Sequence, residues 1–395
     1  MKKIKSISIK NLKILKDISL ELGNLTLITG VNSSGKSTFI QSLLLLKQNQ
    51  ELLQREIRSL SLFNMFKNRE EDEEILRYLS ENTNKTPINL NSKYIQLGES
   101  KDILNENVYD EDIKIHLLMS KDKYCNINCN NKSLLISIDS NLKKFIENEL
   151  NLFADDFQYI NTDRIQPDTI YPLSEIEVRK NLIGLKGEYT AHYLDENRHK
   201  SLLIKELQHK NAKTEQFLEN VSLWLSEISN GIEVLIKKNI GINRASLSYK
   251  YTFGNNVTNE YKPMNVGFGI TYVLPIIVAI LKSKPNDLLI IENPESHLHP
   301  SGQSKIAELC AIASSNGVQI IVETHSDHFL NGVRVATKKE LLKPDDSKVY
   351  FFEKEDETMS TQVHTLEINK DGNINEKWPS GFFDEYRKLL DELLW

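Results

Sequence analysis

The segment GVNSSGKST at residues 30–38 restricts the fold more than any other part of the chain. It has the spacing of a phosphate-binding loop, in which backbone N–H groups of a glycine-bearing turn converge on phosphate oxygens at the positive end of a helix. An apolar run at residues 25–29 precedes the loop and another at residues 39–46 follows it, as the flanking strand and helix require. We therefore expect the chain to bind a nucleoside triphosphate.

Two side chains of this loop have specific roles in the pattern. Lys36 reaches the outer phosphates, and the Ser37 hydroxyl binds the accompanying Mg²⁺. The residues expected to contact the nucleotide are Asn32, Ser33, Ser34, Gly35, Lys36, Ser37 and Thr38.

Composition argues against several classes of protein. Of three cysteines among 395 residues, Cys125 and Cys129 lack the second ligand pair that would complete a zinc site. The amino terminus alternates charged and apolar residues, unlike a signal peptide. Residues 273–281, the most apolar stretch, are about half as long as a bilayer requires. We expect a cytoplasmic protein with no membrane span.

The net charge of −6 means that nucleic-acid binding would require a local basic patch. Residues 2–16 and 198–213 are the candidates, and for both an ordinary solvated surface is the favoured interpretation.

Apolar runs at two distant places in the chain indicate the two halves of one nucleotide-binding core. Runs without alternation are typical of strands buried on both faces of a mostly parallel sheet. The segments are an alternating strand at residues 4–9, apolar strands at residues 18–22, 25–29, 287–291 and 318–322, and helices at residues 36–48 and 302–314.

The chain between these halves differs in composition. Residues 68–85 are acidic and rich in asparagine, which favours a mobile segment. Short alternating and helical segments follow. We expect residues 1–50 and 260–395 to form the core, and residues 51–259 to form an insertion with β hairpins and helical segments.

Acidic and imidazole side chains follow two of the expected core strands. Residues 288–300 read LLIIENPESHLHP, and the next strand ends in ETHSD, which includes His325. A carboxylate at the carboxyl end of a parallel strand lies beside the phosphate loop in such sheets, where it can hold a metal-bound water. Glu292 is the candidate for this position.

A second glycine-bearing segment precedes the apolar helix expected at residues 271–281. The residues are Gly267, Phe268 and Gly269. They form another helix amino terminus able to meet phosphate, although the glycines could instead only relieve crowding in a turn.

With these motifs in place, most of the chain resembles the ABC-type ATPase heads of the OLD and SMC-like group, and especially bacterial AAA15-type ATPases with a DUF3696 carboxyl terminus. The resemblance assigns residues 267–269 to the signature, residues 292–300 to Walker B and the D-loop, and His325 to the switch histidine. It implies ATP and Mg²⁺ as cofactors, with Ser37, Gln48 and Glu292 at the metal.

The resemblance also implies an α/β fold, a P-loop NTPase of ABC-ATPase head type. Its mostly parallel core sheet would be accompanied by an antiparallel β lobe and a helical insertion. Such heads work as homodimers in which the signature of one subunit closes over the triphosphate bound by the other. The expected catalytic residues are Glu292, Asn293, Glu295 and His325.

Asn293 departs from the family pattern. Most relatives have a glutamate at this position, which serves as general base, and an amide cannot accept a proton. It can still orient the attacking water, and Glu295, His297 or His325 could accept the proton instead. We therefore expect slow ATP hydrolysis.

A transition-metal cluster of Glu292, Glu295, His297 and His299 is disfavoured, because the spacing lacks a helical histidine pair.

Two functions are open at this stage. The first, by family analogy, is an ATP-gated switch in bacterial antiphage defence or DNA processing that controls a separate effector such as a nuclease. Only about seventy residues follow His325, too few for the TOPRIM domain of OLD proteins, so we expect any nuclease to be a partner. The alternative is a stand-alone SMC-like ATPase that clamps DNA in repair. A transporter subunit is disfavoured, because a Leu-Ser-Gly-Gly-Gln signature is lacking.

The amphipathic helix at residues 382–394 is expected to pack on the core.

Overall fold

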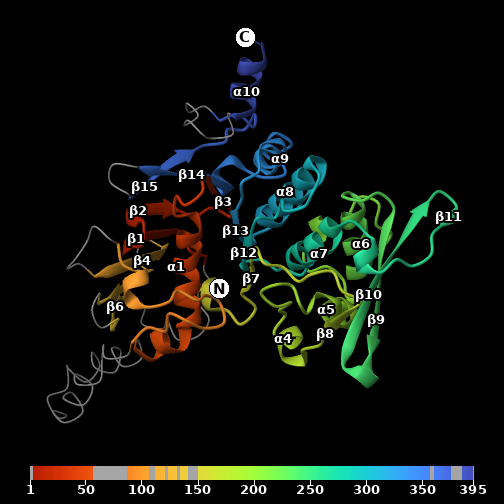
Figure 1. The fold of residues 1–395 in the computed structure, drawn as a ribbon, viewed down its shortest axis with the longest axis horizontal. Helices are drawn as coiled ribbons and strands as arrows, with labels where there is room; N and C mark the ends of the chain where they lie inside the picture. The colour runs from red at the N-terminus through yellow and green to blue at the C-terminus, as the bar shows by residue number, and fades with distance from the viewer. Residues whose placement is uncertain are drawn as a thin grey trace. The chain divides into compact units, whose positions relative to one another are not determined.

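The computed structural model describes residues 3–56, 87–105, 112–120, 123–130, 134–140, 150–355, 360–374 and 385–394 (Figure 1). The chain divides into two compact units. The first consists of Met1–Leu22, Gly30–Ala154 and Phe351–His364, and the second of Gly23–Thr29, Asp155–Tyr350 and Thr365–Trp395. The stretch at residues 68–85, expected to be mobile, lies outside the described residues.

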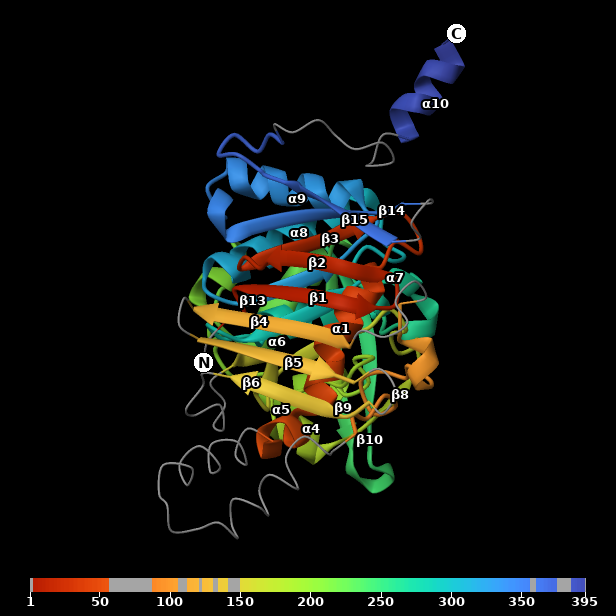
Figure 2. The ribbon, with the colours of Figure 1, turned by 90° about the vertical axis from the view of Figure 1, so that its left-hand side faces the viewer.

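An antiparallel sheet of five strands dominates the first unit (Figure 2). Its order is β2-β1-β4-β5-β6, and the register pairs Ile9 with Ile18 on one side and with Ile115 on the other. Alternate residues of β1 are buried, as expected for a sheet with one covered face. The strands are β1 (Ser6–Leu12), β2 (Leu15–Glu21), β4 (Ile113–Ser120), β5 (Lys123–Cys129) and β6 (Ile136–Ser140). The predicted antiparallel lobe is thus present.

The helix α1 (Lys36–Gln48) belongs to the same unit. Its apolar side chains are buried, and Phe39 packs edge-on against Phe352 with ring centroids 6.2 Å apart. Phe352 belongs to β14 (Ser347–Glu355), whose later residues lie in the first unit beside β15 (Ser360–Leu366).

A parallel sheet forms the core of the second unit. β13 (Gln319–Glu323) lies between β3 (Leu25–Gly30) and β12 (Leu288–Glu292), and β7 (Gln158–Ile160) pairs with the far side of β12. All three pairings are parallel. Residues 288–291 and every residue of β13 are buried, which explains why these strands read as unbroken apolar runs.

Helices of the second unit follow the order expected for a parallel sheet with crossover connections. α7 (Phe268–Leu281) contacts β12 and β7, and α8 (Pro300–Ser315) contacts β13 and α9 (Asp327–Lys338). α8 and α9 pack so closely at Gly332 that a Cβ added there would lie 2.7 Å from the Cβ of Ala307.

The remaining elements of this unit lie within residues 170–257. The sheet contains β8 (Ile170–Pro172), β9 (Ile232–Asn239), β10 (Arg244–Phe253) and β11 (Asn256–Val257), and the helices are α4 (Glu175–Arg179), α5 (Thr190–Asn197) and α6 (Phe217–Ser226). β7, inside the predicted insertion, is a strand of the core sheet, so the insertion contributes directly to that sheet. The boundaries at residues 50 and 260 stay a prediction.

The C-terminal helix α10 (Glu385–Leu394) differs from the expectation of core packing. Leu389, Leu393 and Leu394 of its apolar face are exposed. Within the part of the chain that the structure describes, no helix has the length and apolarity to cross a membrane.

Candidate nucleotide site

The phosphate loop continues directly from β3, and its lysine is held by the loop itself. The Lys36 ammonium is buried and donates to the backbone carbonyls of Gly30, at 3.0 Å, and of Val31, at 2.6 Å. The Ser34 hydroxyl also donates to the Val31 carbonyl, at 2.8 Å. The loop is therefore a closed turn around the lysine, and Ser37 at the start of α1 is exposed.

Backbone geometry explains both glycines of the loop. Gly30 has φ of 142° and Gly35 has φ of 98°, in the region that favours glycine. A Cβ on Gly30 would lie 2.0 Å from the Phe352 carbonyl oxygen, and one on Gly35 would lie 2.7 Å from the Thr361 hydroxyl. That hydroxyl donates to the Ser34 carbonyl at 2.8 Å. The loop is thus fixed by packing as well as by the Lys36 contacts.

Gln48, an expected metal ligand, lies at the end of α1 with both polar atoms engaged. Its Nε2 donates to the Asn89 carbonyl at 2.7 Å, and its Oε1 accepts from the Ile95 N–H at 3.2 Å. Its metal role stays a prediction.

Glu292 is the last residue of β12, and two hydroxyl groups surround its carboxylate. Thr162 donates to Glu292 Oε2 at 3.1 Å, and the Tyr159 hydroxyl also donates to this carboxylate. Burial raises the pKa of the Glu292 carboxyl above its ordinary value, and the two hydroxyl donors oppose that shift. The carboxylate therefore has an oriented position at the carboxyl end of its strand, which fits a metal-binding role.

The backbone at Asn293 is left-handed, with φ of 45°. Asparagine adopts this conformation more readily than most residues with a longer side chain. The Asn293 N–H donates to the Glu323 carbonyl at 2.8 Å, which carries the hydrogen-bond ladder of β12 and β13 one residue further. Backbone geometry thus favours the amide that replaces the usual glutamate.

Glu295 and His325 are brought together by the loops that follow β12 and β13. Glu295 Oε1 accepts from the His325 N–H at 2.7 Å, and Oε2 accepts from the Thr324 hydroxyl at 2.8 Å. Burial raises the pKa of the Glu295 carboxyl, although both hydrogen bonds favour its charged form. Glu295 therefore positions the backbone of the segment that follows β13 and contains His325, called the switch segment below. The His325 side chain itself is exposed.

The two signature glycines have different surroundings at the start of α7. A Cβ on Gly269 would lie 2.3 Å from the His297 carbonyl oxygen, so this glycine permits close packing of the loop after β12. Gly267 is exposed and has φ of −55°, and none of the described residues lies within 4 Å of an added Cβ. Neither packing nor backbone conformation in this chain accounts for a glycine at position 267.

Arg164 and Tyr272 are contacts of this region that the sequence did not reveal. Arg164 donates to the carbonyls of Glu292 and Asn293, and its guanidinium carbon lies 4.6 Å from the centre of the Tyr272 ring. Neither residue belongs to a recognisable motif. The only sequence signal is an arginine soon after the short strand β7, and such an arginine alone would not indicate a site.

The structure also bears on the alternative metal cluster. His299 is the N-cap of α8: its side chain accepts from the Ser301 N–H, and its Nδ1 lies 2.9 Å from the Ser301 hydroxyl, so it has a capping role. Among the described residues, the group with metal-ligand spacing is instead Glu175, His192 and Glu196. His192 Nδ1 accepts from the Ser174 N–H at 3.1 Å, which leaves the proton of a neutral ring on Nε2, the atom facing the carboxylates. That tautomer has no lone pair for a metal at Nε2.

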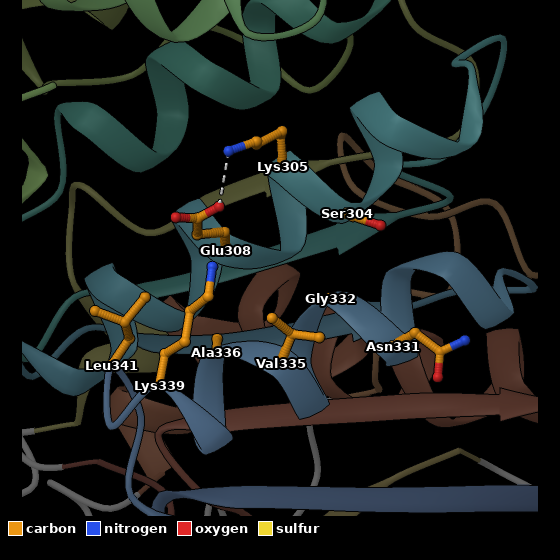
Figure 3. Close-up of a pocket in the computed structure, with 9 residues that line it drawn as sticks. All are labelled: Ser304, Lys305, Glu308, Asn331, Gly332, Val335, Ala336, Lys339 and Leu341. Atoms are coloured by element: carbon orange, nitrogen blue, oxygen red, sulfur yellow. Dashed lines mark hydrogen bonds and ion pairs between the residues drawn. The ribbon is translucent and has the colours of Figure 1, made fainter. Parts of the chain in front are cut away.

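A hollow of about 240 Å³ between α8 and α9 is separate from these motifs (Figure 3). Val335, Ala336 and Leu341 form its apolar part, and Lys305 and Glu308 pair across its rim at 3.2 Å. None of the predicted site residues lines it.

Comparisons with known proteins agree with this architecture. A family model described as the AAA ATPase domain matches residues 1–330, and the model of DUF3696, a protein of unknown function, matches residues 342–393. The head of an SMC protein, solved with the C-winged helix domain of ScpA, superposes with a TM-score of 0.51 at 13% identity, covering 93% of this chain and 98% of that one. This likeness concerns the fold alone, and it confirms the predicted fold class.

Two curated relatives are nucleases by name. Endonuclease GajA of Bacillus cereus (strain HuB5-5) is 25% identical over 283 residues, which are 61% of this chain and 38% of that protein. Old nuclease of Escherichia phage P2 is 32% identical over 66 residues, which are 17% of this chain and 11% of that protein. The chain therefore matches well under half the length of either relative. The resemblance to the AAA15 and OLD-like group is confirmed.

Substitutions at the two signature glycines should differ in their effect on the free energy of unfolding. Gly269→Ala should lower the free energy of unfolding by about 1–3 kcal/mol, because the added methyl group meets the His297 carbonyl. Gly267→Asp should leave stability unchanged or raise it, because aspartate is a favourable N-cap and position 267 is open. Urea unfolding of both variants measures this, and equal losses of stability would contradict the assignment.

Proposed function

Since the chain belongs to the AAA ATPase domain family, we propose that it is an ATP-gated dimeric switch. In this proposal ATP is bound by the phosphate loop of one subunit and covered by residues 267–269 of the other. Binding of ATP, more than its hydrolysis, is the signal that the dimer transmits.

The start of α7 is the observation that carries this proposal. The helix has 14 residues, its first residues include no acidic side chain, and no side chain of the described residues caps its exposed amino terminus. The first N–H groups of a helix have no partner within the helix and carry a partial positive charge. Gly267 adds open space at this point. Together these features fit a triphosphate that this subunit does not itself bind.

The residues of the phosphate loop also fit this ligand. Asn32, Ser33, Ser34, Gly35 and Thr38 would supply the turn and helix start around the phosphates. Lys36 would exchange its two carbonyl contacts for phosphate oxygens. Ser37 and Glu292 would hold Mg²⁺, with Gln48 as a further candidate, and bound Mg²⁺ neutralises charge on the phosphates.

Hydrolysis in this proposal is slow. Asn293 can orient a water but cannot take its proton, and both oxygens of Glu295 already accept hydrogen bonds from Thr324 and His325, which follow β13. His325, whose side chain is exposed, remains the candidate for contact with the outer phosphate. A long-lived ATP-bound dimer is the expected consequence.

The proposed output is control of a separate nuclease in antiphage defence or DNA processing. It is supported by the two relatives named as nucleases, of which this chain matches only part. The chain would then supply the ATP-dependent half of a two-protein system.

Changing Asn293, the residue proposed to orient the attacking water, should change ATP turnover and not ATP binding. Asn293→Glu restores a general base, a group that contributes about 10²-fold or more to a rate, and should raise turnover of saturating ATP by at least about tenfold. Glu292→Gln should abolish turnover, and Lys36→Ala should abolish ATP binding. Steady-state phosphate release and isothermal titration measure these effects.

Fast wild-type turnover that Asn293→Glu leaves unchanged would contradict slow hydrolysis. ATP binding by Lys36→Ala equal to wild type would contradict the site itself.

The nuclease partnership predicts complex formation that depends on ATP. The protein mixed with the products of the genes beside its own should co-elute with a nuclease in the presence of ATP and Mg²⁺, and Lys36→Ala should not. Size-exclusion chromatography with both proteins purified tests this. DNA binding by the ATP-loaded dimer alone, with no nuclease retained, would favour the SMC-like clamp instead.

A further inference from the structure

We propose that Arg164 and Tyr272 form a latch that couples the signature helix α7 to the catalytic end of β12. The proposal rests on the proposed function, because it assigns to Arg164 and Tyr272 the transmission of contact at residues 267–269 to Glu292 and Asn293. Both are positioning residues, since they act through the backbone and side chains of the site.

In the first half of the latch, the Arg164 guanidinium donates hydrogen bonds to the backbone carbonyls of Glu292 and Asn293. Arg164 Nη1 donates to the Glu292 carbonyl at 2.8 Å and to the Asn161 carbonyl at 3.2 Å. Arg164 Nη2 donates to the Asn293 carbonyl at 2.7 Å. One planar guanidinium therefore fixes two successive peptide groups, a geometry that the point charge of lysine cannot reproduce.

The second half of the latch comes from α7. The Tyr272 ring lies under the Arg164 guanidinium at 4.6 Å, and its hydroxyl donates to the Thr162 carbonyl at 3.1 Å. The hydroxyl of the same Thr162 donates to Glu292 Oε2. Tyr272 thus contacts both the group that holds the Glu292 backbone and the residue that holds its side chain.

Aromatic contacts extend the latch to the signature. The Phe268 ring lies 5.0 Å from that of Tyr272, and the His297 ring lies 4.7 Å from Phe268 and 5.1 Å from Tyr272. Phe268 is itself exposed at the start of α7. A displacement of Phe268 would therefore reach Tyr272 through direct ring contact.

The burial of Arg164 shows that this arrangement is more than surface pairing. Its side chain is among the largest fully buried ones, with 1% exposure, and its Nε makes no hydrogen bond with any described residue. Burial lowers the pKa of the guanidinium to about 10, which still leaves it charged near neutral pH. A buried charge held by carbonyls and one aromatic face makes those contacts sensitive to small movements of α7.

Variants of Tyr272 test the latch with less risk to folding than variants of Arg164. Tyr272→Leu removes the ring and the hydroxyl, whereas Tyr272→Phe keeps the ring over Arg164. We expect Tyr272→Leu to lower maximal ATP turnover at least about tenfold, with the ATP dissociation constant within twofold of wild type, and Tyr272→Phe to stay within threefold in both. Single-turnover ATP cleavage over a range of protein concentrations measures these values.

Ile277→Ala is the matched control. Ile277 is fully buried on the same helix and has no place in the latch, so its variant reproduces a loss of core packing. Its turnover per folded molecule should equal wild type. A loss equal to that of Tyr272→Leu would show that Tyr272 acts only through stability and would overturn the latch.

A double variant tests the coupling directly. If Arg164 and Tyr272 act as one device, Arg164→Lys combined with Tyr272→Leu should be no slower than the slower single variant. Multiplicative losses, or a Tyr272→Leu rate equal to wild type, would overturn the latch. A wild-type rate per subunit that does not rise with protein concentration would instead overturn the dimeric switch, and the two failures are therefore distinguishable.

Discussion

The parallel pairing of β13 with β3 on one side and β12 on the other determines where the predicted site residues after β12 and β13 lie. The register aligns Ile28, Glu323 and Glu292 across three strands, so the segments that follow all leave the sheet at the same edge. The hydrogen bonds from Asn293 to the Glu323 carbonyl and from Thr324 to the Ile28 carbonyl extend this alignment past the strand ends. The motif after β12 and the switch segment after β13 therefore meet, which the Glu295 contacts with Thr324 and His325 make visible.

The backbone in this region accounts for residues that motifs alone leave ambiguous. Gly269 is required by the approach of the His297 carbonyl, whereas no described residue lies within 4 Å of a Cβ added to Gly267. Asn293 occupies a left-handed conformation, so its identity is favoured by the fold as well as by any catalytic need. The local structure therefore accounts for Gly269 and Asn293, and it leaves Gly267 as the position for which a bound ligand is the proposed explanation.

Much of the core could be predicted from the sequence because its strands are buried on both faces and carry unbroken apolar runs. β3, β12 and β13 are of this kind, and the phosphate loop could be predicted from the spacing of its glycines and Lys36. β7 could not be predicted, because three residues give no periodicity and its place in the sheet depends on a pairing with distant β12. Arg164 and Tyr272 were missed for a similar reason, since a cation and an aromatic ring 108 positions apart in the chain (164 to 272) meet only through the tertiary fold.

Mixing two inactive variants would show whether two subunits share one composite nucleotide site. Lys36→Ala lacks the phosphate loop function and Gly267→Asp places a negative charge at the signature, so each alone should neither dimerise with ATP nor hydrolyse it. A heterodimer of the two contains one intact pair of phosphate loop and signature. For a composite site, we expect an equimolar mixture to recover ATP-dependent dimers and a measurable fraction of wild-type turnover. A mixture as inactive as its components, or full activity of Gly267→Asp alone, would contradict it.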